Sequence, residues 1–136
     1  MVSLIAMLSS GKGTWGQVSS LINCAKWDKI YLICNDFAYE NFDIDSSKAL
    51  KLKIDEKNSL EMFDKLSNFF KKEIKDFEVA INISSGSGGE HMVLVSAILK
   101  SGLGIRFVYA ENKELKEFEL LNEKYVESEE EEEDEF

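Results

Sequence analysis

Several residue types that would point to particular functions are scarce in this chain of 136 residues. It has no proline, one histidine (His91) and two cysteines (Cys24 and Cys34). One histidine and two separated cysteines supply no cluster of ligands, so we predict no metal site and no metal catalysis. No stretch approaches the ~18 consecutive apolar residues that a membrane-spanning helix requires. We therefore expect no membrane partner.

The start of the chain has no recognisable targeting signal. Residues 2–8 are apolar, but this run is too short for a signal peptide and has neither a basic flank nor a cleavage site. We therefore expect a cytoplasmic protein whose two thiols stay reduced and pack as small apolar side chains.

The negative charge is concentrated in one segment. The net charge is −10, and residues 127–136 contain eight acidic residues and no basic one. Without them, 18 acidic residues stand against 16 basic ones, a net charge of about −2. A segment of like charges repels itself and cannot form a core, so we predict a disordered acidic tail at 127–136 after one folded domain at 1–126. We expect no non-specific binding to duplex nucleic acid.

The pattern of apolar residues predicts an α/β fold. Continuous apolar runs predict buried strands at residues 2–8, 29–34, 77–83 and 105–109, and alternation predicts an edge strand at 50–54. Apolar residues at helical spacing follow the strands at 2–8, 50–54 and 77–83. One helix is expected to start at Asn58 or Ser59, and another to run from about Met92 to a C-cap at Gly102. Residues 115–126 add an edge strand or a docking helix. The order predicts a three-layer Rossmann-like domain with a mostly parallel sheet of five or six strands.

Two turns rich in glycine and serine are the most informative feature. Residues 9–16 follow the predicted strand at 2–8, and we call them the first turn. Residues 84–91 follow the predicted strand at 77–83, and we call them the second turn. In a parallel sheet both emerge at the carboxyl edge, where free N–H groups and helix N-termini bind anions. We therefore predict one composite ligand site made of Ser9, Ser10, Gly11, Lys12, Gly13, Thr14, Trp15, Ser84, Ser85, Gly86, Ser87, Gly88, Gly89 and His91.

The first turn allows three interpretations. Gly11, Gly13 and Gly16 match the dinucleotide-binding fingerprint, and Asp36 lies where an acid would bind ribose, which favours an NAD- or nucleotide-binding Rossmann enzyme or subunit. Alternatively, the glycines adopt unusual backbone angles in a purely structural turn whose Thr14 caps the next helix. In the third interpretation Lys12, a lone cation among N–H donors, binds phosphate.

The second turn carries a family resemblance. Asn82-Ile83-Ser84-Ser85-Gly86-Ser87, followed by an apolar helix from Met92, resembles the strand-end signature of CARF domains, the CRISPR-associated Rossmann-like sensors. The sequence departs from that signature in having Ser85 where a first glycine is common and Glu90 in the region where a base is common. The rest of residues 1–121 resembles the family more loosely.

The resemblance implies a stand-alone antiviral-defence protein without a cofactor. It implies a homodimer that binds a cyclic oligoadenylate on its two-fold axis through both turns, with Trp15 as a stacking surface for adenine. Slow metal-independent cleavage of that ligand stays open, with no catalytic residue assigned. His91 is either an ordinary helix-start residue, satisfied by solvent or Glu90, or a group that positions phosphate or acts in acid–base chemistry. A purely structural or partner-binding subunit is the remaining hypothesis.

Overall fold

The apolar runs form the strands of one sheet. The computed structural model describes residues 2–118, except the side chain of Lys12. The strands are β1 (Leu4–Leu8), β2 (Ile30–Cys34), β3 (Leu50–Lys53), β4 (Glu78–Asn82), β5 (Gly104–Glu111) and β6 (Glu114–Phe118). Their order is β3-β2-β1-β4-β5-β6, and β6 runs antiparallel to β5 while the other neighbours are parallel. The predicted mostly parallel sheet of five or six strands is confirmed, with six strands.

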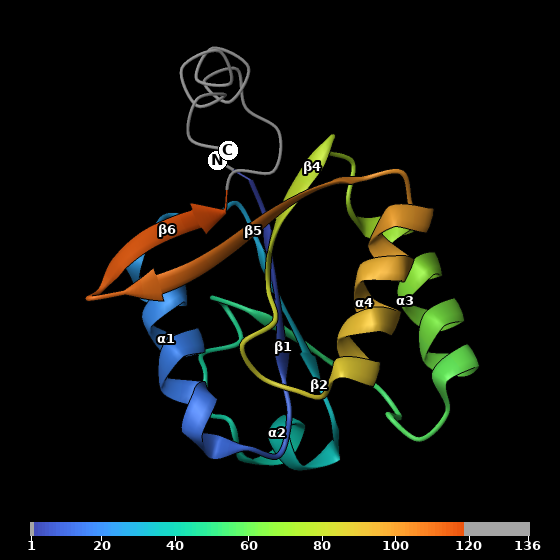
Figure 1. Ribbon diagram of the computed structural model, residues 1–136, viewed down its shortest axis with the longest axis horizontal. Helices are drawn as coiled ribbons and strands as arrows, with labels where there is room; N and C mark the ends of the chain where they lie inside the picture. Colours follow the sequence, from blue (N-terminus) through green and yellow to red (C-terminus); the bar gives the residue numbers. More distant parts are fainter. Residues whose placement is uncertain (1, 119–136) are drawn as a thin grey trace, which may run out of the picture.

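Helices cover both faces of the sheet. The helix α1 (Trp15–Cys24), which follows the short 3-10 helix η1 (Lys12–Thr14), and α2 (Asp36–Asn41) lie on one face; α3 (Ser59–Glu73) and α4 (Gly88–Lys100) lie side by side on the other (Figure 1). All five residues of β1 are buried and alternate between the two cores. Such a run, apolar at every position, is what a strand covered on both faces requires.

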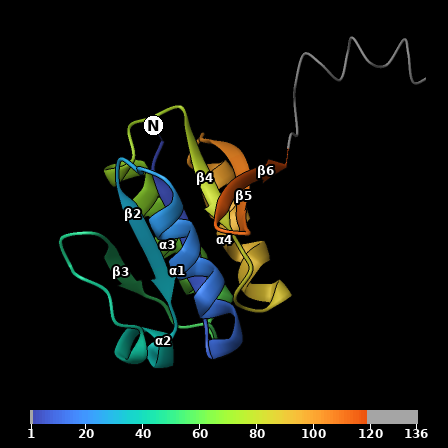
Figure 2. The same cartoon turned by 90° about the vertical axis from the view of Figure 1, so that its left-hand side faces the viewer.

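The chain reverses its direction across the sheet at β1. It moves outward from β1 to β2 and β3, and then returns to place β4 on the other side of β1. Figure 2 shows α1 in front of this sheet, with β2 and β3 on one side and β4, β5 and β6 on the other. The carboxyl ends of β1 and β4 therefore flank a topological switch point, where open α/β sheets bind ligands. The first and second turns both begin there.

One of the two predicted helix starts differs from the pattern-based expectation. The helix α4 begins at Gly88 rather than near Met92, because Ser87 and Glu90 form a capping box around its first turn. Gly88 and Gly89 are thus helical. The expected start of α3 is confirmed, since the Asn58 side chain accepts a hydrogen bond from the Glu61 N–H.

The C-terminal part of the described chain ends in an edge strand. Residues 114–118 form an edge strand, one of the two alternatives for that region, while the predicted tail at 127–136 lies outside the described residues. Gly102 has a φ of +82°, as expected for a residue that ends a helix. Within residues 2–118 no helix combines the length and the apolar character needed to cross a membrane.

The two cysteines differ in burial. Cys34 is fully buried in β2, and this burial raises the pKa of its thiol to about 12. Cys24, at the end of α1, is half-buried, and burial also raises its pKa. Both thiols are therefore poor nucleophiles at neutral pH.

Candidate functional site

The structure brings the first and second turns together. The Ser9 N–H donates a hydrogen bond to the Ser85 hydroxyl at 3.0 Å, and Ser85 is buried. Between the turns lies an open pocket of about 420 Å³, lined by Ser9, Ser10, Gly11, Gly13, Thr14, Ser84, Gly86, Ser87 and Glu90. Eight of the predicted site residues therefore meet at one place. Trp15, Ser85, Gly88, Gly89 and His91 do not line this pocket, and the Lys12 side chain is outside the described part.

The second turn is tightly held. Asn82, at the end of β4, donates to the Val108 carbonyl at 2.8 Å and accepts from the Ser84 N–H at 3.2 Å. Gly86 has a φ of +103°, and a Cβ atom there would lie 2.9 Å from Cγ of Met7. His91 Nε2 lies 2.7 Å from the Ser85 carbonyl oxygen, so it acts as the donor. His91 thus holds the shape of the turn rather than lining the pocket.

The first turn is much more open. Cβ atoms built on Gly11, Gly13 and Gly16 would meet no atom within 4 Å, and none of these glycines has a positive φ. The expectation that they adopt unusual backbone angles is therefore wrong. The expectation that Thr14 caps α1 is also wrong, because its backbone is already helical and its hydroxyl donates to the Gly11 carbonyl at 3.1 Å. The start of α1 is left without a side-chain cap from Thr14.

Trp15 anchors the first turn to the rest of the domain. Its indole N–H donates to the Ser9 carbonyl at 2.8 Å. Its ring packs against Phe37 and Phe42, with centroid distances of 5.8 and 5.6 Å. These contacts give Trp15 a scaffolding role behind the pocket, so we do not include it among the proposed ligand contacts.

Asn35, which pattern analysis missed, ties a third strand end to the site. It follows β2 directly and is buried. Its Nδ2 donates to the hydroxyls of Ser10 at 2.8 Å and Ser9 at 3.2 Å, while its Oδ1 accepts from the Ala38 N–H and caps α2. An asparagine between an apolar strand and a helix is a typical N-cap, and that signal could have identified it.

The α4 side of the pocket is acidic. Glu90 is only 7% exposed, and its Oε1 accepts hydrogen bonds from the Ser87 N–H at 2.8 Å and the Ser9 hydroxyl at 3.4 Å. Burial raises the pKa of Glu56, and the nearby Glu90 carboxylate raises it further. A phosphate is therefore less favourable on this side than near the first turn.

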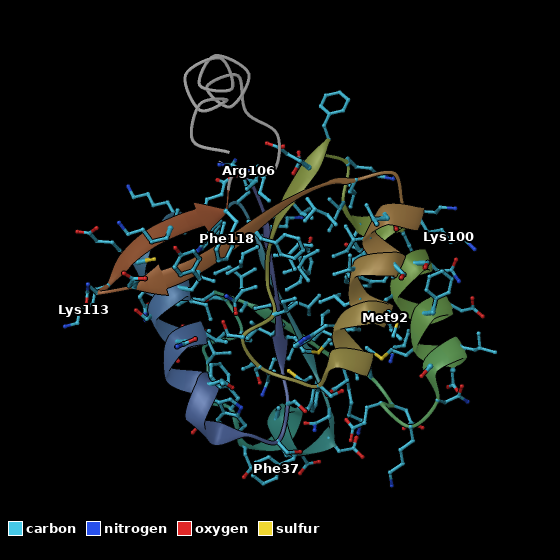
Figure 3. All side chains as sticks on the ribbon, viewed as in Figure 1. Phe37, Met92, Lys100, Arg106, Lys113 and Phe118 are labelled. Carbon is cyan, nitrogen blue, oxygen red and sulfur yellow. The ribbon has the colours of Figure 1, made fainter. Side chains whose placement is uncertain are left out.

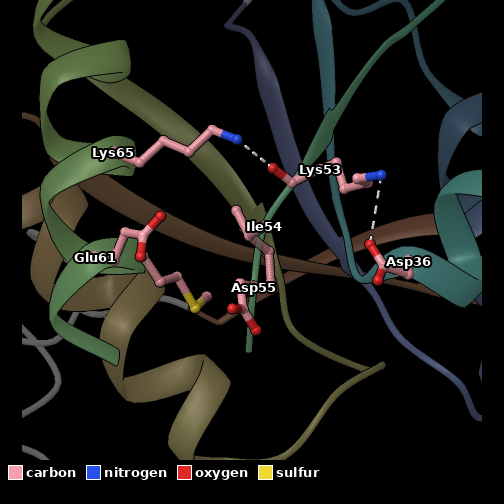
Figure 4. A pocket seen from close by; sticks show the side chains of 7 residues that line it. Asp36, Lys53, Ile54, Asp55, Glu61 and Lys65 are labelled. Carbon is pink, nitrogen blue, oxygen red and sulfur yellow. Dashed lines mark hydrogen bonds and ion pairs between the residues drawn. The ribbon is translucent and has the colours of Figure 1, made fainter. Parts of the chain in front are cut away.

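Asp36 lies at a different place. It lines a separate pocket of about 160 Å³, where its Oδ1 is 3.5 Å from Nζ of Lys53, and Lys65 donates to the Lys53 carbonyl (Figure 4). Arg106 pairs with Glu117 and Glu78, so it reaches surface carboxylates as expected. Within residues 2–118 no three His, Cys, Asp or Glu side chains lie close enough to hold a metal ion.

Comparisons with known proteins show a shared fold. No family model and no curated protein match the sequence. The solved structure of Can2 from Sulfobacillus thermosulfidooxidans, in complex with cyclic tetra-adenylate (cA4), matches with a TM-score of 0.57 and 8% sequence identity. This likeness shows that the two proteins share a fold. The match covers 85% of this chain but 36% of the Can2 chain, so this chain spans little more than a third of Can2's length.

Proposed function

We propose that this protein binds a cyclic oligoadenylate in the pocket between the first and second turns. The observation that carries the proposal is that both turns line one pocket, at the switch point between β1 and β4. The fold shared with Can2 supports it, because the Can2 structure is a complex with cyclic tetra-adenylate. The proposal includes no cofactor.

The lining groups suit an uncharged sugar edge and a phosphate. The serine hydroxyls of the pocket, among them Ser10 and Ser84, both donate and accept hydrogen bonds. The N–H groups at the start of η1 and α1, together with the Lys12 ammonium, supply donors for a phosphodiester. We assign the phosphate contact to the first turn, where residues 9–16 contain no acid.

The proposal includes a second copy of the chain. A pocket of about 420 Å³ falls near the lower end of the ~300–1,000 Å³ typical of ligand sites, so one copy accommodates part of a ring of several nucleotides. Met92 and Leu99 lie seven residues apart on α4 and are 69% and 59% exposed (Figure 3 labels Met92). Because α4 starts beside the pocket, pairing these faces would bring two pockets toward one two-fold axis.

The proposal also includes slow, metal-independent cleavage of the bound ring. A ribose 2′-hydroxyl held in line attacks the adjacent phosphorus; the bond to the 5′-oxygen breaks, which leaves a 2′,3′-cyclic phosphate and a 5′-hydroxyl. The hydroxyl proton passes to a base and the 5′-oxygen takes up a proton from water. The carboxylate of Glu90, at the pocket wall, is the proposed acceptor of the proton from the 2′-hydroxyl.

Native mass spectrometry of the full chain tests binding and assembly together. The probes are cyclic tri-, tetra- and hexa-adenylate, with NAD as the competing ligand. We expect a dimer carrying one ring, and chromatography of the same samples after incubation reports cleavage. Met92→Lys should weaken the dimer, whereas Leu60→Lys, a matched change at the 78%-exposed Leu60 of α3, should not. The proposal would be overturned by a monomer that binds none of the three cyclic adenylates, or by selective binding of NAD.

A further inference from the structure

Glu90 is a buried carboxylate with one oxygen that lacks a partner. The side chain is 7% exposed, and its Oε1 accepts from Ser87 and Ser9. Its Oε2 is buried and has no hydrogen-bond partner among the described residues. An ionised oxygen buried without a donor is unfavourable, so we expect a donor to reach Oε2 when the pocket is occupied.

Because Glu90 lines the pocket, we expect a ligand in the pocket to supply this donor, and a phosphate group cannot do so. Glu90 belongs both to the first turn of α4 and to the pocket wall. A helix N-terminus usually attracts phosphate, but here the chain's own carboxylate occupies that position. Glu56 adds negative charge nearby, and a phosphodiester has no hydrogen to donate. The α4 side therefore rejects phosphate and favours a hydroxyl.

The first turn has the opposite preference. Residues 9–16 contain one base, Lys12, and no acid. The segment after β1 thus contains a base and no acid, whereas the pocket wall at the start of α4 contains the acid Glu90. A ligand with phosphate on one edge and a hydroxyl on the other fits only one way round.

We propose, on the basis of the function proposed above, that Glu90 accepts a hydrogen bond from a ribose 2′-hydroxyl and so makes the pocket selective for ribonucleotide rings. In a 3′,5′-linked ring the 2′-hydroxyl is the one free hydroxyl of each sugar. A carboxylate acceptor makes the hydrogen bond charge-assisted and roughly twice as strong as a neutral one. The phosphates of the same ligand face the first turn.

Calorimetric titration of the full chain compares cyclic tetra-adenylate with its all-2′-deoxy analogue. The wild type should bind the ribose ring at least ~10-fold more tightly, the effect of a lost hydrogen bond to a buried charge. Glu90→Gln keeps an oxygen for the cap but loses the charge, and its amide can donate to phosphate; the preference should fall below about threefold. The matched control is Glu61→Gln in the first turn of α3, where Glu61 is exposed and accepts from Asn58 Nδ2 at 3.1 Å. This control should keep the wild-type preference.

The outcomes separate the two proposals. Wild-type protein that binds both rings equally would overturn the role of Glu90 and leave ring binding intact, whereas protein that binds neither ring would overturn both. Without ligand, Glu90→Gln should unfold at the same urea concentration as the wild type or a higher one, because it removes an unpartnered buried charge. A much lower midpoint would indicate a cationic partner already on Oε2 in the free protein, and would contradict the assignment.

Discussion

The first and second turns are both rich in glycine and serine, yet they are held in different ways. In the first turn, added Cβ atoms on Gly11 and Gly13 would meet nothing within 4 Å. In the second turn, Gly86 has a positive φ and lies against Met7 and His91. In the first turn the glycines therefore leave the backbone accessible, whereas in the second turn Gly86 allows a backbone conformation that other residues rarely adopt. The second turn is therefore tightly packed around Gly86, whereas the first turn leaves open space around its glycines.

This difference assigns separate tasks to the two turns. The second turn is anchored by buried groups, with Ser85 joined to both Ser9 and His91. The first turn contains Lys12 and no acid, so we propose that it binds the phosphate. The predictions below test this division, from the largest expected effect to the smallest.

Replacing Gly86 should damage the fold, whereas replacing Gly13 should not. Gly86→Ala forces a side chain into a backbone conformation with φ of +103° and against Cγ of Met7 at 2.9 Å. We expect it to lower the free energy of unfolding by at least ~2 kcal/mol. Gly13→Ala has space and an ordinary φ, and should change stability by less than about 1 kcal/mol. Urea denaturation of both variants measures the contrast. Equal losses would contradict the division between the turns.

Replacing Lys12 should weaken binding and leave the fold unchanged. Lys12→Ala removes a charge-assisted hydrogen bond of about 1.5–3 kcal/mol, so affinity for cyclic tetra-adenylate should fall about 10- to 150-fold. The loss should shrink as salt screens the charge. Lys26→Ala, an exposed position after the far end of α1, is the control and should bind like the wild type. Calorimetry at two salt concentrations measures the affinity of each variant for cyclic tetra-adenylate. An unchanged affinity in Lys12→Ala would show that this side chain is only solvated.

The sequence predicted the fold better than the detail of the site. The buried runs at β1 and β2 are apolar at every position, so a parallel sheet was the expected solution. The early start of α4 was also readable, because Ser87 and Glu90 have the spacing of a capping box. The cap at Thr14 was predicted wrongly because its backbone angles depend on the conformation of the whole first turn. The burial of Glu90 arises from the approach of β1 to β4, which no local pattern encodes.

Replacing Ser85 should uncouple the turns with a moderate effect. Its hydroxyl accepts from the Ser9 N–H at 3.0 Å and is buried. Ser85→Ala leaves that N–H without its partner, so we expect a loss of about 1–2 kcal/mol in the free energy of unfolding. The control is Ser96→Ala on α4, an exposed position where alanine favours the helix. If the two variants are equally stable, the link between the turns does not contribute to the fold.

Replacing Asp36 should have the smallest effect on ring binding and separates the two nucleotide hypotheses. In a dinucleotide site an acid at the end of β2 binds ribose, so its loss should abolish binding of NAD. Here Asp36 pairs with Lys53 at 3.5 Å, its side chain is 84% exposed, and it lines a pocket separate from the one between the turns. Such an exposed ion pair contributes little. Asp36→Ala should therefore bind cyclic tetra-adenylate within about threefold of the wild type, or ~0.7 kcal/mol. Titration of both ligands into both proteins gives a direct answer: wild-type binding of NAD that disappears in Asp36→Ala would favour the dinucleotide site over the pocket between the turns.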